Sequence, residues 1–358
     1  MHTAPIALTF DDILLEPQYS EVKSRSLVDT STILVDGIRL KVPIISANMD
    51  TVTEFEMARV MDYNGGFGII HRFMSMEDQA AEIFHFKDIG GKFIGAAIGI
   101  KDDCTEHAER CIAAGVDVLC LDVAHGHTKV VGDVLDRLLA KHPDLKIIAG
   151  NVATYGGAKF LIEHGAAAVK CGVGPGSVCT TRVVAGVGVP QVTAISRCAE
   201  ACQEAGIPLI ADGGIRNPSD VAKAIALGAD TVMVGGLLAK TMDSPGMIVE
   251  KDGKLFKSYR GMASKGAMAR RREVEVKHLN GSSPEPRLEH LAPEGIETLV
   301  PYTEQRAKDV LNFLVGGLRS AMSYSNATTV EEFQNNAVFT RISQAGLTES
   351  HPHAIMGV

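Results

Sequence analysis

Short apolar runs recur eight times in the first two thirds of the chain, and stretches of helical pattern separate them. Gly, Pro, Asn or Asp residues bound these runs, as expected for strands that are buried on both faces of a parallel sheet. We therefore predict eight parallel strands, at residues 42–49, 66–71, 94–99, 117–124, 146–151, 167–173, 207–215 and 230–238.

The connecting segments have the pattern of helices. The clearest lies at residues 217–228, where Asn217 is a good N-cap, Pro218 suits the first helical position and Gly228 ends the helix. Segments 115–122, 165–172 and 228–235 resemble one another, because each begins with a glycine that ends a helix and continues into an apolar strand. Eight such βα units favour an α/β fold of the (β/α)8 TIM barrel type, because closure removes both sheet edges. An open doubly wound sheet is the alternative.

The last 120 residues follow a different pattern. Residues 270–287 are charged, contain Pro and Gly and lack apolar periodicity, which predicts a mobile flap. A helical pattern returns around residues 304–318, and a polar tail ends in residues 349–353. We predict a single catalytic domain over residues 1–358, with a flap insertion after strand eight and a C-terminal extension.

Charge and composition exclude several classes of function. A net charge of −8 argues against partners such as nucleic acid or an anionic membrane. The seven cysteines include no CxxC pair, so they indicate neither a disulfide framework nor a zinc site, but a reducing compartment. We see no signal peptide and no apolar run long enough to span a membrane, and we expect a cytoplasmic protein.

Polar residues follow several of the predicted strands. Asn48, Asp122, His125, Asn151 and Asp212 all lie at such strand ends. In α/β barrels the C-terminal ends of the strands form the active site, so these residues are candidates for function. The alternative is that Asn48 and Asn151 only cap turns and that His125 only bonds to backbone.

Two glycine pairs follow strands seven and eight. Gly213 and Gly214 end the seventh strand, and Gly235 and Gly236 lie near the end of the eighth. Backbone without side chains lets amide groups converge on a phosphate beside a helix N-terminus, which predicts a phosphate site. Asp212 is then placed to accept hydrogen bonds from ribose hydroxyls. Tight turns without a ligand are the alternative.

The loop at residues 172–181 carries three glycines and a proline ahead of Cys179. Such a loop can expose the thiol, and a thiolate there would be a nucleophile. A lone cysteine is more often a small buried hydrophobe. We expect that of the other six.

At these residues the chain resembles the inosine monophosphate dehydrogenase and guanosine monophosphate reductase family, nearly from end to end. The matching segments lie at residues 8–12, 46–52, 149–152, 172–182, 211–214, 259–262 and 316–320. The resemblance implies a purine mononucleotide, of the GMP or IMP type, as substrate and a nicotinamide cofactor.

The resemblance also implies roles for individual residues. The catalytic residues would be Cys179, which bonds to purine C2, with Thr181 and Glu294 as a proton relay. Substrate would be held by Ser46, Met49, Ser177, Asp212, Gly213, Gly214, Gly235, Gly236, Tyr259, Gly261 and Met262. The cofactor would lie against Asp122, Val123, Ala124, Asn151, Gly172 and Gly174.

A potassium site and an oligomer follow from the same resemblance. Potassium would bind the carbonyl groups of Gly174, Gly176 and Cys179, completed by residues of a neighbouring subunit, namely Glu349, Ser350 and His351. A site shared in this way implies a homo-oligomer, which we expect to be a homotetramer.

The family contains two reactions, and residues 261–294 distinguish them. Dehydrogenases oxidise IMP with NAD and hydrolyse the covalent intermediate with an adjacent Arg and Tyr, a pair missing between Gly261 and Glu294. That absence favours GMP reductase, with NADPH as cofactor. No residue that would read the 2′-phosphate of NADPH is identifiable from the sequence.

Of the other sequence features, some favour GMP reductase and others favour IMP dehydrogenase. Regulatory modules of the cystathionine-β-synthase (CBS) type, typical of the dehydrogenases, would insert near residues 87–92 and are missing there. His71-Arg72, the tail at 341–353 and a long flap instead resemble dehydrogenases. IMP dehydrogenase therefore remains the alternative, and a noncatalytic nucleotide-binding relative the second one.

Overall fold

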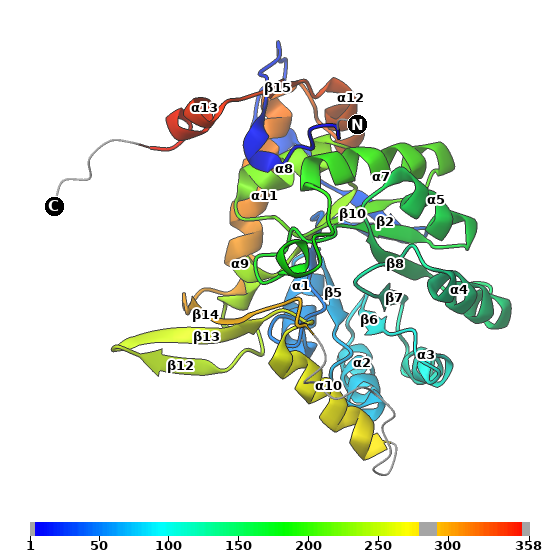
Figure 1. Cartoon of the computed structure of the whole chain (residues 1–358). Coiled ribbons are helices and arrows are strands. Elements are labelled where there is room, and N and C mark those ends of the chain that lie inside the picture. Colours follow the sequence, from blue (N-terminus) through cyan, green and yellow to red (C-terminus); the bar gives the residue numbers. More distant parts are fainter. Residues whose placement is uncertain (1–3, 279–291, 353–358) are drawn as a thin grey trace.

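A closed barrel of eight parallel strands forms the centre of the computed structural model, which describes residues 4–278 and 292–352 (Figure 1). The strands are β4 (Ile44–Ser46), β5 (Phe67–Ile70), β6 (Gly95–Ile98), β7 (Val118–Asp122), β8 (Ile147–Val152), β9 (Ala168–Cys171), β10 (Leu209–Asp212) and β11 (Thr231–Val234). β11 pairs with β4 and closes the barrel. The eight predicted strands and the TIM barrel are confirmed, and nearly every strand residue is buried, as the continuous apolar runs indicated.

Helices surround the barrel (Figure 1). They are α1 (Phe55–Tyr63), α2 (Met76–Asp88), α3 (Cys104–Ala113), α4 (Lys129–Lys141), α5 (Tyr155–Glu163), α6 (Thr181–Val184), α7 (Gln191–Ala205), α8 (Pro218–Ala226) and α9 (Gly236–Ala239). In α8 the Asn217 side chain accepts from the amides of Ser219 and Asp220, and Pro218 occupies the first turn, as predicted. None of the described helices is long and apolar enough to cross a membrane.

Segments outside the barrel brace it. They are η1 (Phe10–Asp12), η2 (Arg25–Leu27), the ladder of β1 (Ile13–Leu15) with β15 (Phe339–Arg341), the hairpin of β2 (Thr32–Val35) with β3 (Ile38–Leu40), and helices α11 (Ala307–Tyr324), α12 (Val330–Asn336) and α13 (Gln344–Glu349). α11 extends the helix predicted at 304–318 and packs on α8. α13 precedes the predicted polar tail and shares Glu349 with it, and residue 353 of the tail lies outside the described residues.

The segment after β11 corrects one prediction. Strands β12 (Ile248–Lys251), β13 (Lys254–Arg260) and β14 (Glu297–Pro301) form an antiparallel sheet, and α10 (Lys265–His278) is a helix where an irregular flap was expected from residue 270. The residues of α10 have good helix propensity, so it needs no apolar stripe. The hydroxyl of Ser264 accepts from the amide of Ala267 and caps its first turn. Residues 279–287 of the predicted flap lie outside the described residues.

Candidate active site

A buried lysine connects the C-terminal ends of four neighbouring strands. Lys170 of β9 is 2% exposed, and its ammonium donates at 2.8 Å to Asp122 on β7 and at 2.8 Å to Asp212 on β10. It also donates to the side-chain oxygen of Asn151 on β8. Burial disfavours the ammonium, but the two carboxylates outweigh burial and raise the pKa of Lys170 above its usual value. We call these four residues the Lys170 cluster.

Lys170 was not among the predicted site residues. It interrupts an otherwise apolar strand, Ala168–Cys171. That interruption was the available signal, because a charge is rarely buried without partners.

The polar residues predicted at strand ends mostly converge on this cluster. The amide of Asn151 donates to the carbonyl of Gly172 at 2.7 Å and to Asp212 at 2.8 Å, so Asn151 links strands rather than capping a turn. Burial raises the pKa of the Asp122 carboxyl, but the charges of Lys170 and Arg72 and a hydrogen bond from Asn48 lower it overall. Asp122 is therefore ionised.

The backbone next to Asp122 is ordered by the neighbouring strand. The amide of Val123 donates to the carbonyl of Gly150 at 3.1 Å, and Val123 in turn accepts from Asn151 at 2.9 Å. Ala124 and His125 follow and are exposed. His125 lies edge-on to His127, with ring centroids 6.4 Å apart. It does not join the cluster.

The Cys179 thiol differs from the other six, which are all buried. It is partly exposed and donates to the hydroxyl of Thr181, at the start of α6, at 3.2 Å. Burial alone raises the pKa of Cys111 to about 12. Cys179 is therefore the accessible thiol, as its glycine-rich loop predicted. Gly172 and Gly174 precede it, and a side chain on Gly174 would collide with Arg182, whose guanidinium donates to Val189 at 2.6 Å.

A distant segment runs antiparallel to the Cys179 loop. The amide of Thr180 donates to the carbonyl of Glu294 at 2.9 Å, and that of Ile296 donates to Val178 at 2.9 Å. The backbone of Glu294 is thus held beside Cys179 and Thr181, although more than a hundred residues separate them in sequence. Glu294 itself is partly exposed.

The glycine pairs lie against the same loop. Gly213 and Gly214 have φ angles of +93° and +82°, which favour glycine, and a Cβ on Gly213 would lie 3.2 Å from the amide nitrogen of Gly176. A Cβ on Gly235 would lie 3.0 Å from the hydroxyl of Tyr259.

Two hydroxyl groups lie beside the glycine pairs. We call the two glycine pairs with the hydroxyl groups of Ser177 and Tyr259 the cradle. A Cβ on Gly236 would lie 3.4 Å from the hydroxyl of Ser177, which is itself 3.4 Å from that of Tyr259. Burial raises the pKa of Tyr259, which therefore keeps its proton. Backbone and hydroxyl groups of three loops thus lie close together.

The remaining residues that were predicted to bind substrate differ in where the structure places them. Met49 lies beside Gly235, and the amide of Gly261 donates to Ile296 at 3.0 Å, which places Met262 near the Cys179 loop. Ser46 differs, since it is fully buried and its hydroxyl has no hydrogen-bond partner among the described residues.

The predicted potassium ligands do not all come together in one chain. Gly176 accepts from the amide of Cys179 at 3.1 Å, within the loop. Glu349, Ser350 and His351 are exposed at the end of α13, which packs against η1 on an arm away from the barrel strands (Figure 1).

Several known proteins are similar to this chain over nearly its whole length. Residues 7–353 match the family model described as IMP dehydrogenase / GMP reductase domain. Inosine-5′-monophosphate dehydrogenase of Borreliella burgdorferi is 41% identical over 401 residues, which cover 98% of each chain. The enzyme of the same name from Cryptosporidium parvum is 41% identical over 390 residues, covering 97% of this chain and 95% of the relative.

A solved structure is similar over the whole fold. The crystal structure of GMP reductase from Trypanosoma brucei in complex with guanosine 5′-monophosphate has a TM-score of 0.92 and 32% identity, and the match covers 99% of both chains. The chain therefore belongs to the IMP dehydrogenase / GMP reductase family, and it is an oxidoreductase that acts on purine nucleotides.

Proposed function

We propose that this chain is a GMP reductase, which converts GMP to IMP and ammonia with NADPH. The observation that carries the proposal is the segment between Gly261 and Glu294, which lacks the adjacent Arg and Tyr that hydrolysis of a covalent intermediate requires in the dehydrogenases. Thr181 and the backbone of Glu294, which would serve deamination, lie beside Cys179, but family dehydrogenases can also have both residues, so these two do not distinguish the reactions.

The reaction divides into two halves at purine C2. The Cys179 thiolate adds to C2 of GMP, and the C2–N bond breaks as the amino group leaves as ammonia, protonated through Thr181 and Glu294. The dihydronicotinamide, when bound, supplies a hydride to C2. The C2–S bond then breaks, which regenerates the thiolate and releases IMP. In total, GMP, NADPH and two protons give IMP, NADP⁺ and ammonium.

The cradle beside Cys179 fits the phosphate of the nucleotide. Ser177, Tyr259 and the amides around Gly213, Gly214, Gly235 and Gly236 would hold it, and side chains at the glycines would fill the space between these groups. Asp212 would bind the ribose, and Met49, Gly261 and Met262 would frame the base.

The Lys170 cluster fits the nicotinamide end of the cofactor. The family resemblance implies the residues that would lie against it: Asp122, Val123, Ala124, Asn151, Gly172 and Gly174. We add Lys170 as a positioning residue, because its ammonium fixes Asp122, Asn151 and Asp212 relative to one another.

A potassium ion would fit the Cys179 loop only with help from a second chain. Among the described residues, the carbonyl oxygens of Gly174 and Cys179 accept no backbone hydrogen bond, so they are available as ligands with Gly176. Glu349, Ser350 and His351 would come from a neighbouring subunit, since their own chain holds them elsewhere.

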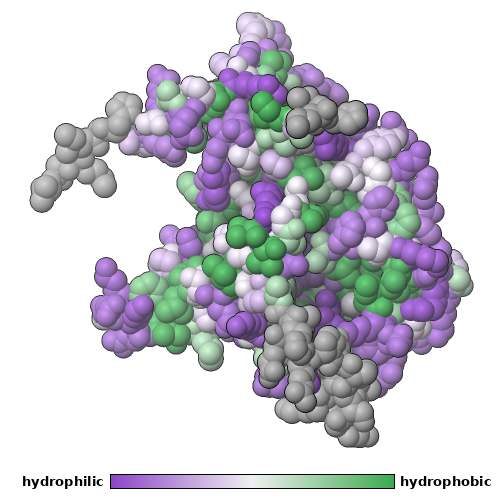
Figure 2. All heavy atoms as spheres, in the orientation of Figure 1, coloured by the Kyte–Doolittle hydropathy of each residue, from purple (hydrophilic) through white to green (hydrophobic). Residues whose placement is uncertain are grey.

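Association into a homotetramer, each subunit a single catalytic domain, is part of this proposal. Exposed apolar residues support association: Figure 2 shows apolar side chains on the projecting β12–β13 hairpin, where Met247, Ile248 and Leu255 are 73%, 54% and 43% exposed.

At the place where a CBS module would insert, Lys87 donates to the carbonyl of Lys92 at 2.9 Å and closes a short turn between α2 and β6.

IMP dehydrogenase remains the second candidate, and the names of the relatives favour it. Both 41% identical relatives are described as inosine-5′-monophosphate dehydrogenases. An IMP dehydrogenase would produce NADH from IMP and NAD.

One assay with two substrate pairs tests the proposal. With GMP and NADPH we expect NADPH oxidation and equimolar IMP and ammonium, and with IMP and NAD no NADH. The Cys179→Ala variant should bind GMP but show no turnover, whereas Cys202→Ala, at a buried cysteine of α7, should remain active. Production of NADH from IMP would overturn the reductase assignment. Absence of turnover with either pair would favour a noncatalytic relative.

A further inference from the structure

An ion pair joins the loop after β4 to the end of β13. Nε of Arg260 donates to a carboxylate oxygen of Asp50 at 2.9 Å, and a second guanidinium nitrogen donates to the same oxygen. The amide of Arg260 also donates to the hydroxyl of Thr51 at 3.4 Å. These contacts connect two segments that lie 210 residues apart in the chain.

The pair is largely shielded from water. The side chain of Asp50 is 6% exposed and that of Arg260 is 27% exposed. The other carboxylate oxygen of Asp50 is buried and has no hydrogen-bond partner among the described residues. Because opposite charges attract more strongly where water is excluded, Arg260 holds this carboxylate more firmly than an ion pair on the open surface would.

The Asp50 end of the pair lies on a tight turn that carries Met49. The amides of Val52 and Thr53 donate to the carbonyl of Met49 at 2.8 and 3.0 Å, and the hydroxyl of Thr53 donates to the carbonyl of Ala47 at 2.7 Å. These bonds close the turn on itself. The place of Met49 relative to β13 therefore depends on the contacts of the whole turn, among which the pair is the charged one.

The Arg260 end lies directly before the segment that carries Met262. Arg260 is the last residue of β13 and pairs with Glu297 of β14. The amide of Ser264 donates to the carbonyl of Gly261 at 2.9 Å, so the chain turns sharply after the strand. β13 and β14 belong to the antiparallel sheet outside the barrel. Arg260 therefore attaches that sheet to a loop of the barrel.

The two segments carry the two methionines that would frame the purine base. Met49 is adjacent to Asp50, Met262 follows Arg260 by two positions, and both methionines are partly exposed. A Cβ on Gly235 would lie 3.4 Å from the sulfur of Met49, which places this side chain beside the cradle. Methionine side chains are flexible, so their backbone determines where they can make contact. The ion pair thus sets the spacing between the two methionines.

We propose that the pair of Arg260 and Asp50 positions Met49 and Met262 against the purine base. This inference rests on the proposed function for the place of the mononucleotide, but it holds for either reaction. The two charged residues are positioning residues, because they act through the methionines. Their role matters for the reaction because purine C2 must approach the Cys179 thiolate, and small displacements of reacting atoms lower rates strongly.

Nucleotide binding in a double-mutant cycle tests the proposal. Calorimetry measures the affinities of GMP and IMP without cofactor, so it requires neither reaction. We expect Arg260→Gln to weaken the binding of both about 10-fold. In a protein that already carries Met49→Ala and Met262→Ala, the same change should weaken binding less than about 2-fold, because the pair then has no methionine to position.

A conservative variant covers the case in which Arg260→Gln does not fold. Arg260→Lys keeps a positive charge beside Asp50 but lacks the planar fork that makes two contacts. We expect it to weaken nucleotide binding about 3-fold, and this loss should also disappear when the two methionines are replaced. The matched control is Arg59→Gln, which breaks an exposed pair with Glu56 on α1 and should leave nucleotide affinity unchanged.

Two results would overturn the proposal. One is wild-type affinity for both nucleotides in Arg260→Gln and Arg260→Lys. The other is a loss of equal size with and without the two methionines, which would mean that the pair acts on another part of the protein. Failure of the proposed function gives a different result: if the assay with IMP and NAD yields NADH, the reductase assignment fails, while the binding cycle still decides the role of the pair.

Discussion

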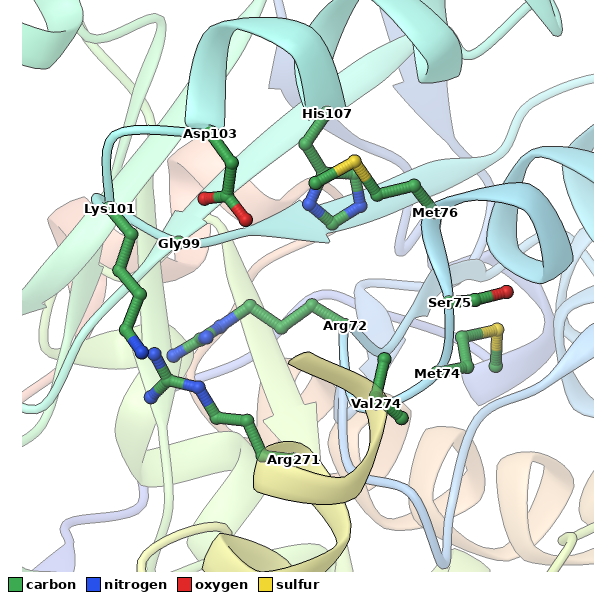
Figure 3. Close-up of a pocket in the computed structure, with 10 residues that line it drawn as sticks. All are labelled: Arg72, Met74, Ser75, Met76, Gly99, Lys101, Asp103, His107, Arg271 and Val274. Atoms are coloured by element: carbon green, nitrogen blue, oxygen red, sulfur yellow. The ribbon is translucent and has the colours of Figure 1, made fainter. Parts of the chain in front are cut away.

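Two groups of charged side chains at the mouth of the barrel differ in how deeply they are buried. In the Lys170 cluster one ammonium lies between two carboxylates and is almost fully buried. In the second group Arg72, Lys101 and Arg271, which come from separate elements, line a pocket at the ends of β5 and β6 (Figure 3). Balanced buried charges stabilise one arrangement of strands, whereas partly exposed cations are still solvated. The first group should therefore lose more stability on mutation than the second.

Removing the buried cation should produce the largest loss of stability. Lys170→Met leaves Asp122 and Asp212 in the barrel mouth without their counter-charge, so we expect the free energy of unfolding to fall by about 3–5 kcal/mol. Urea denaturation measures this. A loss below about 1 kcal/mol would mean that water replaces the ammonium and that the cluster does not stabilise the barrel.

Acidification should release part of the same stability. The folded-state pKa of Asp122 is lowered, so its contribution is present above its unfolded pKa of about 4 and is lost as the pH falls through the folded value. The Asp122→Asn variant lacks this contribution, and its unfolding free energy should fall less steeply below about pH 4 than that of wild type. Urea denaturation of both proteins across this range tests the difference. If the unfolding free energies of the two proteins fell equally steeply below about pH 4, the prediction would be wrong.

Removing a pocket cation should change stability least. Arg271→Gln alters a partly exposed side chain of α10, so we expect a change in unfolding free energy within about 0.5 kcal/mol. A large destabilisation would show that Arg271 holds α10 on the barrel, and the contrast between the two groups would disappear.

The parts of the candidate site that depend on local sequence could be predicted. Cys179 and the glycine pairs were recognisable because local sequence sets loop conformation, and the ends of parallel strands meet at one edge. Glu294 was expected only through the family resemblance, and its place beside Thr180 depends on backbone pairing between distant segments. Ser46, also expected through the resemblance, is fully buried at the end of β4, which its local sequence does not show.

By itself, the sequence determined the eight apolar runs, and burial on both faces makes such runs the strands of a closed parallel barrel. It also determined which loop exposes a thiol. The tertiary structure alone decided which side chains meet: Lys170 with its two carboxylates, and Arg72, Lys101 and Arg271 in one pocket. The physical reason is that such groups come from different strands and helices. Barrel closure and packing, rather than spacing along the chain, set the distances between them.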